Sequence, residues 1–174
     1  IQGHMGPGDA GLLTEGQRGM VHSEWNNGDV PTRAYILVYN TDPIPEQTSF
    51  TVLKDGDAPR YQEGDGVRIK EVVGPQSGLR VHGDLRLFTD SALEDGAVLT
   101  MALGDGEGGL LSIREGQIRL DDQVLGEGVT ILLPPAEEAR SIELWRLEEF
   151  GLERVETFEG FYTFIGQARD DSGD

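Results

Sequence analysis

The sequence predicts an all-β protein, an antiparallel β-sandwich or jelly roll of about ten strands that follows an extended N-terminal arm. Glycine makes up 25 of the 174 residues, about twice its usual share of roughly 7%, which indicates many tight turns. Runs of strand-forming residues recur about every 8–12 residues between turns, a spacing typical of sandwiches and barrels. Residues 79–89 alternate apolar and polar side chains with the period of a strand rather than a helix.

The chain divides into four segments. Residues 1–5 look like the remnant of a cleaved affinity tag and are left out of the fold prediction. Residues 6–32 are polar and glycine-rich, and we expect an arm that Trp25 fixes to an apolar patch. If that patch belongs to another copy, the arm is a device for homo-oligomerisation. Residues 33–167 form the predicted β-sandwich domain, and residues 168–174 form an acidic C-terminal tail.

The first half of the predicted domain contains four strand signals. Residues 34–39 are apolar on both faces, as in a central strand that is covered on both sides. Residues 49–54 and 67–70 follow, with an acidic loop between them. Residues 79–89 give the clearest strand. We expect one of its faces to be apolar, with Leu79, Val81, Leu85 and Leu87, and the other polar, with Arg80, His82, Asp84 and Arg86.

The second half continues the pattern and contains one ambiguous stretch. Strands are predicted at residues 97–103, 110–114, 117–120 and 129–133. Residues 135–150 begin with signals of a helix start and are followed by Gly151, a helix-stop signal. Their apolar residues, however, are spread all round a helical wheel and form no stripe. A strand at 142–147 that pairs as a hairpin with residues 155–165 fits better, with one helical turn at 135–140 as an addition.

The charge of the chain restricts its partners. It has 32 acidic and 14 basic side chains, a formal net charge of −18, which repels nucleic-acid backbones and anionic lipid surfaces. No apolar run reaches the roughly 18 residues of a membrane span, so membrane insertion is not expected. Adaptation to high salt, a GC-rich genome and cation binding are three explanations for the acidity. The absence of cysteine excludes disulfides and thiolate sites.

Carboxylates are the candidates for catalysis. A glycoside hydrolase needs two of them facing each other across a sugar, roughly 5–10 Å apart. Glu143 and Glu149 can share one face of the predicted strand, and Glu156 can lie across the hairpin. The alternative is that these acids are outward charges on an edge hairpin, where they oppose aggregation.

A second acidic group suggests a metal. Asp55, Asp57, Glu63 and Asp65 fall within one short loop region, and carboxylate oxygens are suitable ligands for Ca²⁺. The spacing does not match an EF-hand, so solvated turns are the simpler interpretation. No cofactor is expected, with a structural Ca²⁺ in one of these loops as the alternative.

Two further groups are candidates for binding. Arg80, His82 and Arg86 would form a cationic stripe able to hold a carboxylate, unless they are solvated ion-pairing partners on a sheet face. The aromatic residues of the C-terminal part either stack on sugar rings or partners, or belong to the core. They are Trp145, Phe158, Tyr162 and Phe164.

Together these features favour a non-catalytic recognition or assembly module of a secreted, cell-surface or virion structure. Its expected partner is a protein or a glycan, bound through the sheet face and the aromatic hairpin. The alternative is a carbohydrate-active enzyme, a jelly-roll hydrolase or lyase that uses paired carboxylates.

Overall fold

The computed structural model describes residues 1–147 and 163–169. Among these residues it has twelve strands, all paired antiparallel, and one short 3-10 helix. The elements are β1 (Ala10–Thr14), β2 (Ser49–Leu53), η1 (Asp55–Asp57), β3 (Arg60–Gln62), β4 (Val67–Val73), β5 (Phe88–Leu93), β6 (Val98–Leu103), β7 (Glu107–Ile113), β8 (Gln117–Leu120), β9 (Gln123–Gly126), β10 (Thr130–Leu133), β11 (Arg140–Arg146) and β12 (Thr163–Arg169).

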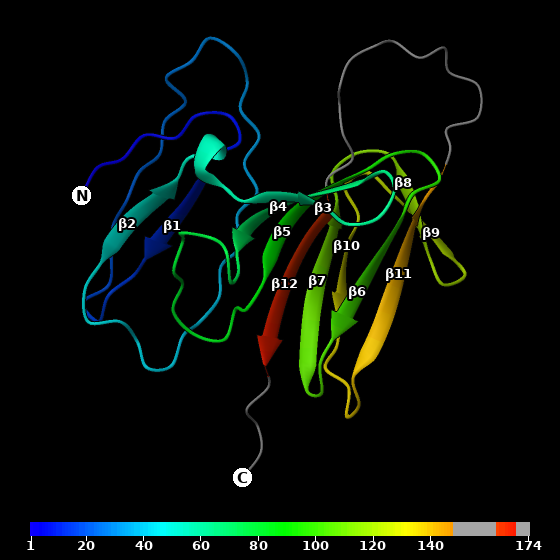
Figure 1. The fold of residues 1–174 in the computed structure, drawn as a ribbon. Helices are drawn as coiled ribbons and strands as arrows, with labels where there is room; N and C mark the ends of the chain where they lie inside the picture. Colours follow the sequence, from blue (N-terminus) through cyan, green and yellow to red (C-terminus); the bar gives the residue numbers. More distant parts are fainter. Residues whose placement is uncertain (148–162, 170–174) are drawn as a thin grey trace.

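Two sheets pack face to face and enclose the main core. One sheet has six strands in the order β10-β7-β12-β5-β4-β3, and the other has four in the order β6-β11-β8-β9 (Figure 1). Strand alternation sends every second side chain between the sheets. The result is the inter-sheet core, which consists of Val67, Ile69, Leu93, Ala97, Leu99, Met101, Leu103, Leu111, Ile113, Ile118, Leu125, Leu133, Ile142 and Leu144.

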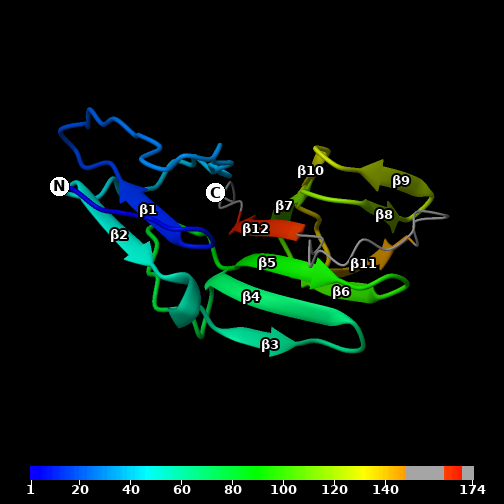
Figure 2. The ribbon, with the colours of Figure 1, turned by 90° about the horizontal axis from the view of Figure 1, so that it is seen from above.

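β1 and β2 form a separate two-stranded sheet. Figures 1 and 2 show it beside β4 and β5, on the side away from the four-stranded sheet. It packs on a second apolar group, the arm-side cluster, formed by Leu53, Ala58, Val72, Val73 and Leu79 with the partly buried Ala10, Leu12, Val81, Leu85 and Phe88 around them.

A register shift in β4 connects the two cores. Val67 and Ile69 belong to the inter-sheet core, but the pairing with β5 shifts between Glu71 and Val73. An extra residue in one strand bends that strand. After the bend Val72 and Val73 pack in the arm-side cluster instead.

Two strand predictions in the first half are wrong. Residues 79–87 contain no strand, because Gly83 has φ +79° and the chain turns there. Leu79 is nevertheless buried and Val81 and Leu85 pack beside it, so the alternation predicted burial correctly. Residues 34–39 also lie outside the strands.

The ambiguous stretch is resolved where the structure describes it. Residues 140–146 are strand β11, which pairs with β6 and β8. The predicted hairpin with residues 155–165 is wrong for its described end, since β12 lies between β5 and β7 in the other sheet. Residues 148–162 and 170–174 are outside the described part, and with them most of the predicted acidic tail.

Parts of the N-terminal segments contact the body of the protein, but Trp25 is 78% exposed and so does not fix the arm to an apolar patch of this chain. Within the predicted arm, β1 pairs with β2, and the carbonyl of His4, in the segment expected to be a tag remnant, accepts a hydrogen bond from Lys54 Nζ. Among the described residues, no helix is long and apolar enough to cross a membrane.

Candidate functional site

The outer face of the four-stranded sheet carries an ordered row of side chains. In β11, Ile142 and Leu144 are buried, while Glu143 and Trp145 face outward. Pairing of β11 with β8 sets Trp145 opposite Arg119. The Arg119 guanidinium carbon lies 5.2 Å from the centre of the Trp145 ring, within the range of a cation–π contact. The strand periodicity of two neighbouring segments thus creates this pair.

The pair borders an open depression of about 410 Å³, lined by Arg119, Asp121, Asp122, Glu143 and Trp145. Asp121 and Asp122 form the two-residue turn between β8 and β9, and Asp121 adopts a left-handed conformation with φ 51°. Aspartate tolerates this conformation better than most residues. Three carboxylates, one guanidinium and one aromatic side chain therefore line the same depression, which combines acceptors, a cation and a flat apolar surface.

The sequence prediction found part of this site. Glu143 and Trp145 were candidates, although for separate roles, and the structure brings them together. Arg119, Asp121 and Asp122 were missed as site residues. Recognising that residues 118–120 pair with 144–146 would have revealed them, because that register puts Arg119 beside Trp145.

The other aromatic and acidic candidates fall in a different part of the chain. Glu149, Glu156, Phe158 and Tyr162 lie outside the described residues. Phe164 belongs to β12, in register with Asp90 of β5 and Ser112 of β7. It is therefore on the six-stranded sheet, whereas Trp145 is on the other sheet.

The predicted cationic stripe is not formed on a strand. Arg80 donates a hydrogen bond to the carbonyl of Ser77, and Arg86 forms an ion pair with Glu107 at 2.5 Å. Arg80, His82 and Arg86 are exposed in the loop before β5. Two of the three side chains are thus engaged in local contacts, and their role in binding stays a prediction.

The acids predicted to bind Ca²⁺ separate into two places. Asp55 and Asp57 are in η1, whereas Glu63 and Asp65 lie in the turn after β3. Asp55 accepts contacts from Arg60 Nη2 at 2.6 Å and from Lys70 Nζ at 2.8 Å. Within residues 1–147 and 163–169, no group of three or more His, Asp or Glu is placed to hold a metal ion. A metal therefore stays a prediction.

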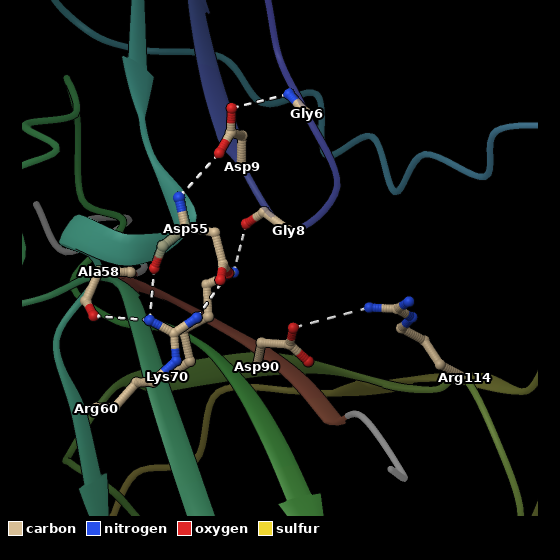
Figure 3. A network of polar contacts seen from close by, with 9 residues as sticks. All are labelled: Gly6, Gly8, Asp9, Asp55, Ala58, Arg60, Lys70, Asp90 and Arg114. Atoms are coloured by element: carbon tan, nitrogen blue, oxygen red, sulfur yellow. Dashed lines mark hydrogen bonds and ion pairs between the residues drawn. The ribbon is translucent and has the colours of Figure 1, made fainter. Parts of the chain in front are cut away.

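Asp55 belongs to an ionic assembly that joins the N-terminal segment to β4. We call it the arm network, and it consists of Asp9, Lys54, Asp55, Arg60 and Lys70. Figure 3 shows these residues except Lys54. Asp9 accepts hydrogen bonds from the backbone N–H groups of Gly6 and Asp55, both at 2.8 Å, and pairs with Lys54 at 2.7 Å. Lys70 donates to the carbonyl of Gly8 at 2.5 Å.

The arm network shifts the pKa values of its acids. The backbone N–H of Gly6, then Lys54 and the N–H of Asp55, lower the pKa of Asp9 to about 2. The hydrogen bond from Lys70, with the help of Arg60, lowers the pKa of Asp55. Asp90 lies in β5, opposite Lys70 of β4. Removal from water raises the pKa of Asp90, although the positive charges of Arg114 and Lys70 act to lower it. These shifts follow from contacts within the protein and indicate a structural role.

No family model matches this sequence, and no curated protein matches it. Solved structures do share its fold. GK1651 from Geobacillus kaustophilus aligns with a TM-score of 0.55 and 14% identity, over 74% of this chain and 50% of that one. A quercetin 2,3-dioxygenase from Acinetobacter baumannii aligns with a TM-score of 0.57 and 14% identity, over 72% of this chain and 41% of that one. This chain thus matches half or less of each structure.

A cupin domain of Cnp3 from Schizosaccharomyces pombe aligns more weakly, with a TM-score of 0.45 and 9% identity over 72% of this chain and 80% of that one. The stronger likenesses confirm the predicted all-β jelly-roll class.

The same comparisons correct the expected function. The expectation of a recognition or assembly module in a secreted, cell-surface or virion structure is contradicted, because the chain shares its fold with a structure named as a quercetin 2,3-dioxygenase.

Proposed function

We propose that this chain is a small-molecule-binding jelly-roll domain whose ligand occupies the depression on the outer face of the four-stranded sheet. The observation that carries the proposal is the Arg119–Trp145 cation–π contact at a depression that three carboxylates also line. An aromatic ring at a hollow supplies contact area, and nearby polar groups fix the orientation of a ligand.

Burial in the rest of the molecule supports this location. The space between the sheets is filled by the inter-sheet core, in which Leu111, Ile118 and Leu144 are 0% exposed. Trp145, in contrast, is 39% exposed although it neighbours Leu144 in the same strand. A large aromatic side chain at the surface is available for a ligand, whereas the interior is occupied by packed side chains.

Quercetin is a reasonable first probe, because one structure with this fold is named as a quercetin 2,3-dioxygenase. It is a flat ring compound with several hydroxyl groups, and carboxylates accept hydrogen bonds from hydroxyls. We propose binding of such compounds and derive no oxidation step.

The chain has only two tryptophans, Trp25 and Trp145, so a ¹⁵N-labelled sample gives two indole N–H signals. Titration with quercetin is expected to shift the Trp145 indole signal and the Arg119 amide signal, while the signal of Trp25 in the arm stays unchanged. Trp25→Phe assigns the signals. Equal movement of both indoles, or movement of neither, would reject the site.

Two variants test whether quercetin binds at the depression. Glu143→Gln removes a charged acceptor and is expected to weaken binding about threefold to tenfold, as a lost charge-assisted hydrogen bond would. Val124→Thr is the matched control, because Val124 is exposed on the same sheet face, opposite Arg119, but does not line the depression. Equal loss in both variants would contradict the proposal.

A further inference from the structure

The chemistry around the depression restricts what it can hold. Asp121, Asp122 and Glu143 bear carboxyl groups, and an ionised carboxylate only accepts hydrogen bonds. A ligand must therefore supply donors. Three acids against one guanidinium in a chain of net charge −18 also disfavour a ligand that is itself an anion.

Arg119 adds a restriction on shape. Its guanidinium, 5.2 Å from the centre of the Trp145 ring, is flat and stacks on aromatic faces, which an ammonium group does not do in the same way. A flat aromatic ligand can stack on the guanidinium, on the indole, or across both. A saturated ring has no π-face to offer to the guanidinium and gains only apolar contact with the indole.

We infer that the depression selects planar aromatic compounds that carry hydroxyl donors and no negative charge, and that Arg119 is the residue that sets this preference. The inference rests on the proposed function and names its ligand class. Trp145 supplies the surface, the three carboxylates receive the hydroxyls, and Arg119 discriminates a flat ring from a puckered one.

Three small probes separate these features. Catechol is flat, neutral and bears two adjacent hydroxyls. Cyclohexane-1,2-diol has the same two hydroxyls on a saturated ring. The third probe, 3,4-dihydroxybenzoate, is flat but adds a carboxylate. Each is titrated against the intact chain, and the Trp145 indole signal is the readout, with Trp25 as the internal reference.

Catechol is expected to bind about twofold to fivefold more tightly than cyclohexane-1,2-diol, the size of an exposed cation–π contribution. It is also expected to bind several-fold more tightly than 3,4-dihydroxybenzoate, and added salt should reduce that second ratio because salt screens charge repulsion.

Arg119→Lys keeps the positive charge and removes the flat group. It is expected to bring the catechol-to-diol ratio close to one while leaving weak binding of both compounds. Arg68→Lys is the matched control, since Arg68 is exposed on β4 of the other sheet, and it should leave the ratio unchanged. An unchanged ratio in Arg119→Lys would overturn the role of Arg119.

The outcomes distinguish the two proposals. If the diol binds as tightly as catechol to the unaltered chain and shifts Trp145, the ligand class is wrong and the site is right. If none of the probes, quercetin included, shifts Trp145, the proposed function itself fails. Far-ultraviolet circular dichroism of each variant verifies that its strands are retained.

Discussion

Leu111, Ile118 and Leu144 of the inter-sheet core are 0% exposed, whereas Ala10 and Leu12 of β1 are only partly buried against the arm-side cluster. The two regions are therefore stabilised differently. The inter-sheet core lies between two sheets that have ten strands in total. In contrast, β1 and β2 form a two-stranded sheet, and such a sheet is only marginally stable in water on its own. The arm network supplies attachment where apolar burial is small.

Some acidic residues of this chain therefore have a structural role, because they attach the β1–β2 sheet to the rest of the protein. Asp9 of the N-terminal segment and Asp55 of η1 each pair with a lysine, and together their contacts connect that segment to β4. The fit is close: a Cβ at Gly8 would lie 2.5 Å from Asp55 Oδ1, and Gly8 has φ +79°, so a larger residue is excluded there. We expect acid and the removal of charged side chains to weaken the attachment of the β1–β2 sheet. We expect substitutions that leave a cavity in the inter-sheet core to lower the free energy of unfolding.

The largest effect is expected from Leu144→Ala. It removes a fully buried side chain from the centre of β11 and should lower the free energy of unfolding by about 3–4 kcal/mol. Urea denaturation followed by circular dichroism measures the loss. Val124→Ala, at a side chain that is 59% exposed, should cost less than about 0.5 kcal/mol. Equal losses would show that the inter-sheet core is not the principal source of stability.

Acid is expected to detach the β1–β2 sheet before the core unfolds. The folded-state pKa values of Asp9 and Asp55 are lowered from 3.8, that of Asp9 to about 2. A lowered carboxyl pKa gives stability that is present above the unfolded value and is lost as the pH falls through the folded value. Between about pH 4 and pH 2, amides of β1 and β2 should therefore lose protection from hydrogen exchange.

In the same acid titration, amides of β6 and β11 are the reference. They should retain protection while those of β1 and β2 lose it. Simultaneous loss in both sheets would mean that the two regions unfold as a single unit and that the comparison between them fails.

Part of the inter-sheet core and part of the arm-side cluster could be predicted from the sequence. Strands were predicted at residues 97–103 and 142–147, and β6 and β11 occupy most of these two ranges. Residues 79–87 show the alternation of a strand without forming one, since a loop that packs on an apolar cluster can also bury every second residue. The positive φ of Gly83 decides between the two, and glycine alone does not reveal its φ.

The site was less accessible to prediction than the fold. Glu143 and Trp145 share a strand face and could be grouped from local periodicity. Arg119 joins them only through the β8–β11 register, a long-range pairing that composition does not specify. The arm network was missed for the same reason, because Asp9 and Asp55 are 46 residues apart in the chain. In the sequence, the turns that hold them look like the many other acidic turns of this chain.

A smaller effect is expected from Asp55→Asn. The substitution weakens the contacts with Lys70 and Arg60, and partly exposed ion pairs contribute at most about 1 kcal/mol. Hydrogen exchange of β1 and β2 should become about threefold to fivefold faster, with the urea midpoint of the core nearly unchanged. Asp57→Asn is the matched control, because Asp57 is exposed in the same short helix. A similar acceleration in both variants would count against the arm network.

The smallest effect is expected from Asp90→Asn, which tests whether every acid near the arm network stabilises the fold. Desolvation raises the pKa of Asp90 above 3.8, although Lys70 lies opposite in the register and Arg114 is 3.7 Å away. A raised carboxyl pKa favours the protonated form, so its stabilising contribution is present at low pH and is lost as the pH rises from the unfolded value through the folded one. Asn imitates the protonated acid, and at pH 7 the free energy of unfolding should stay within about 0.5 kcal/mol of the original or rise slightly. If Asp90→Asn instead lowered the free energy of unfolding by about 2 kcal/mol at pH 7, the ion pairs of Asp90 would stabilise the fold. The arm network would then have to include Asp90 of β5.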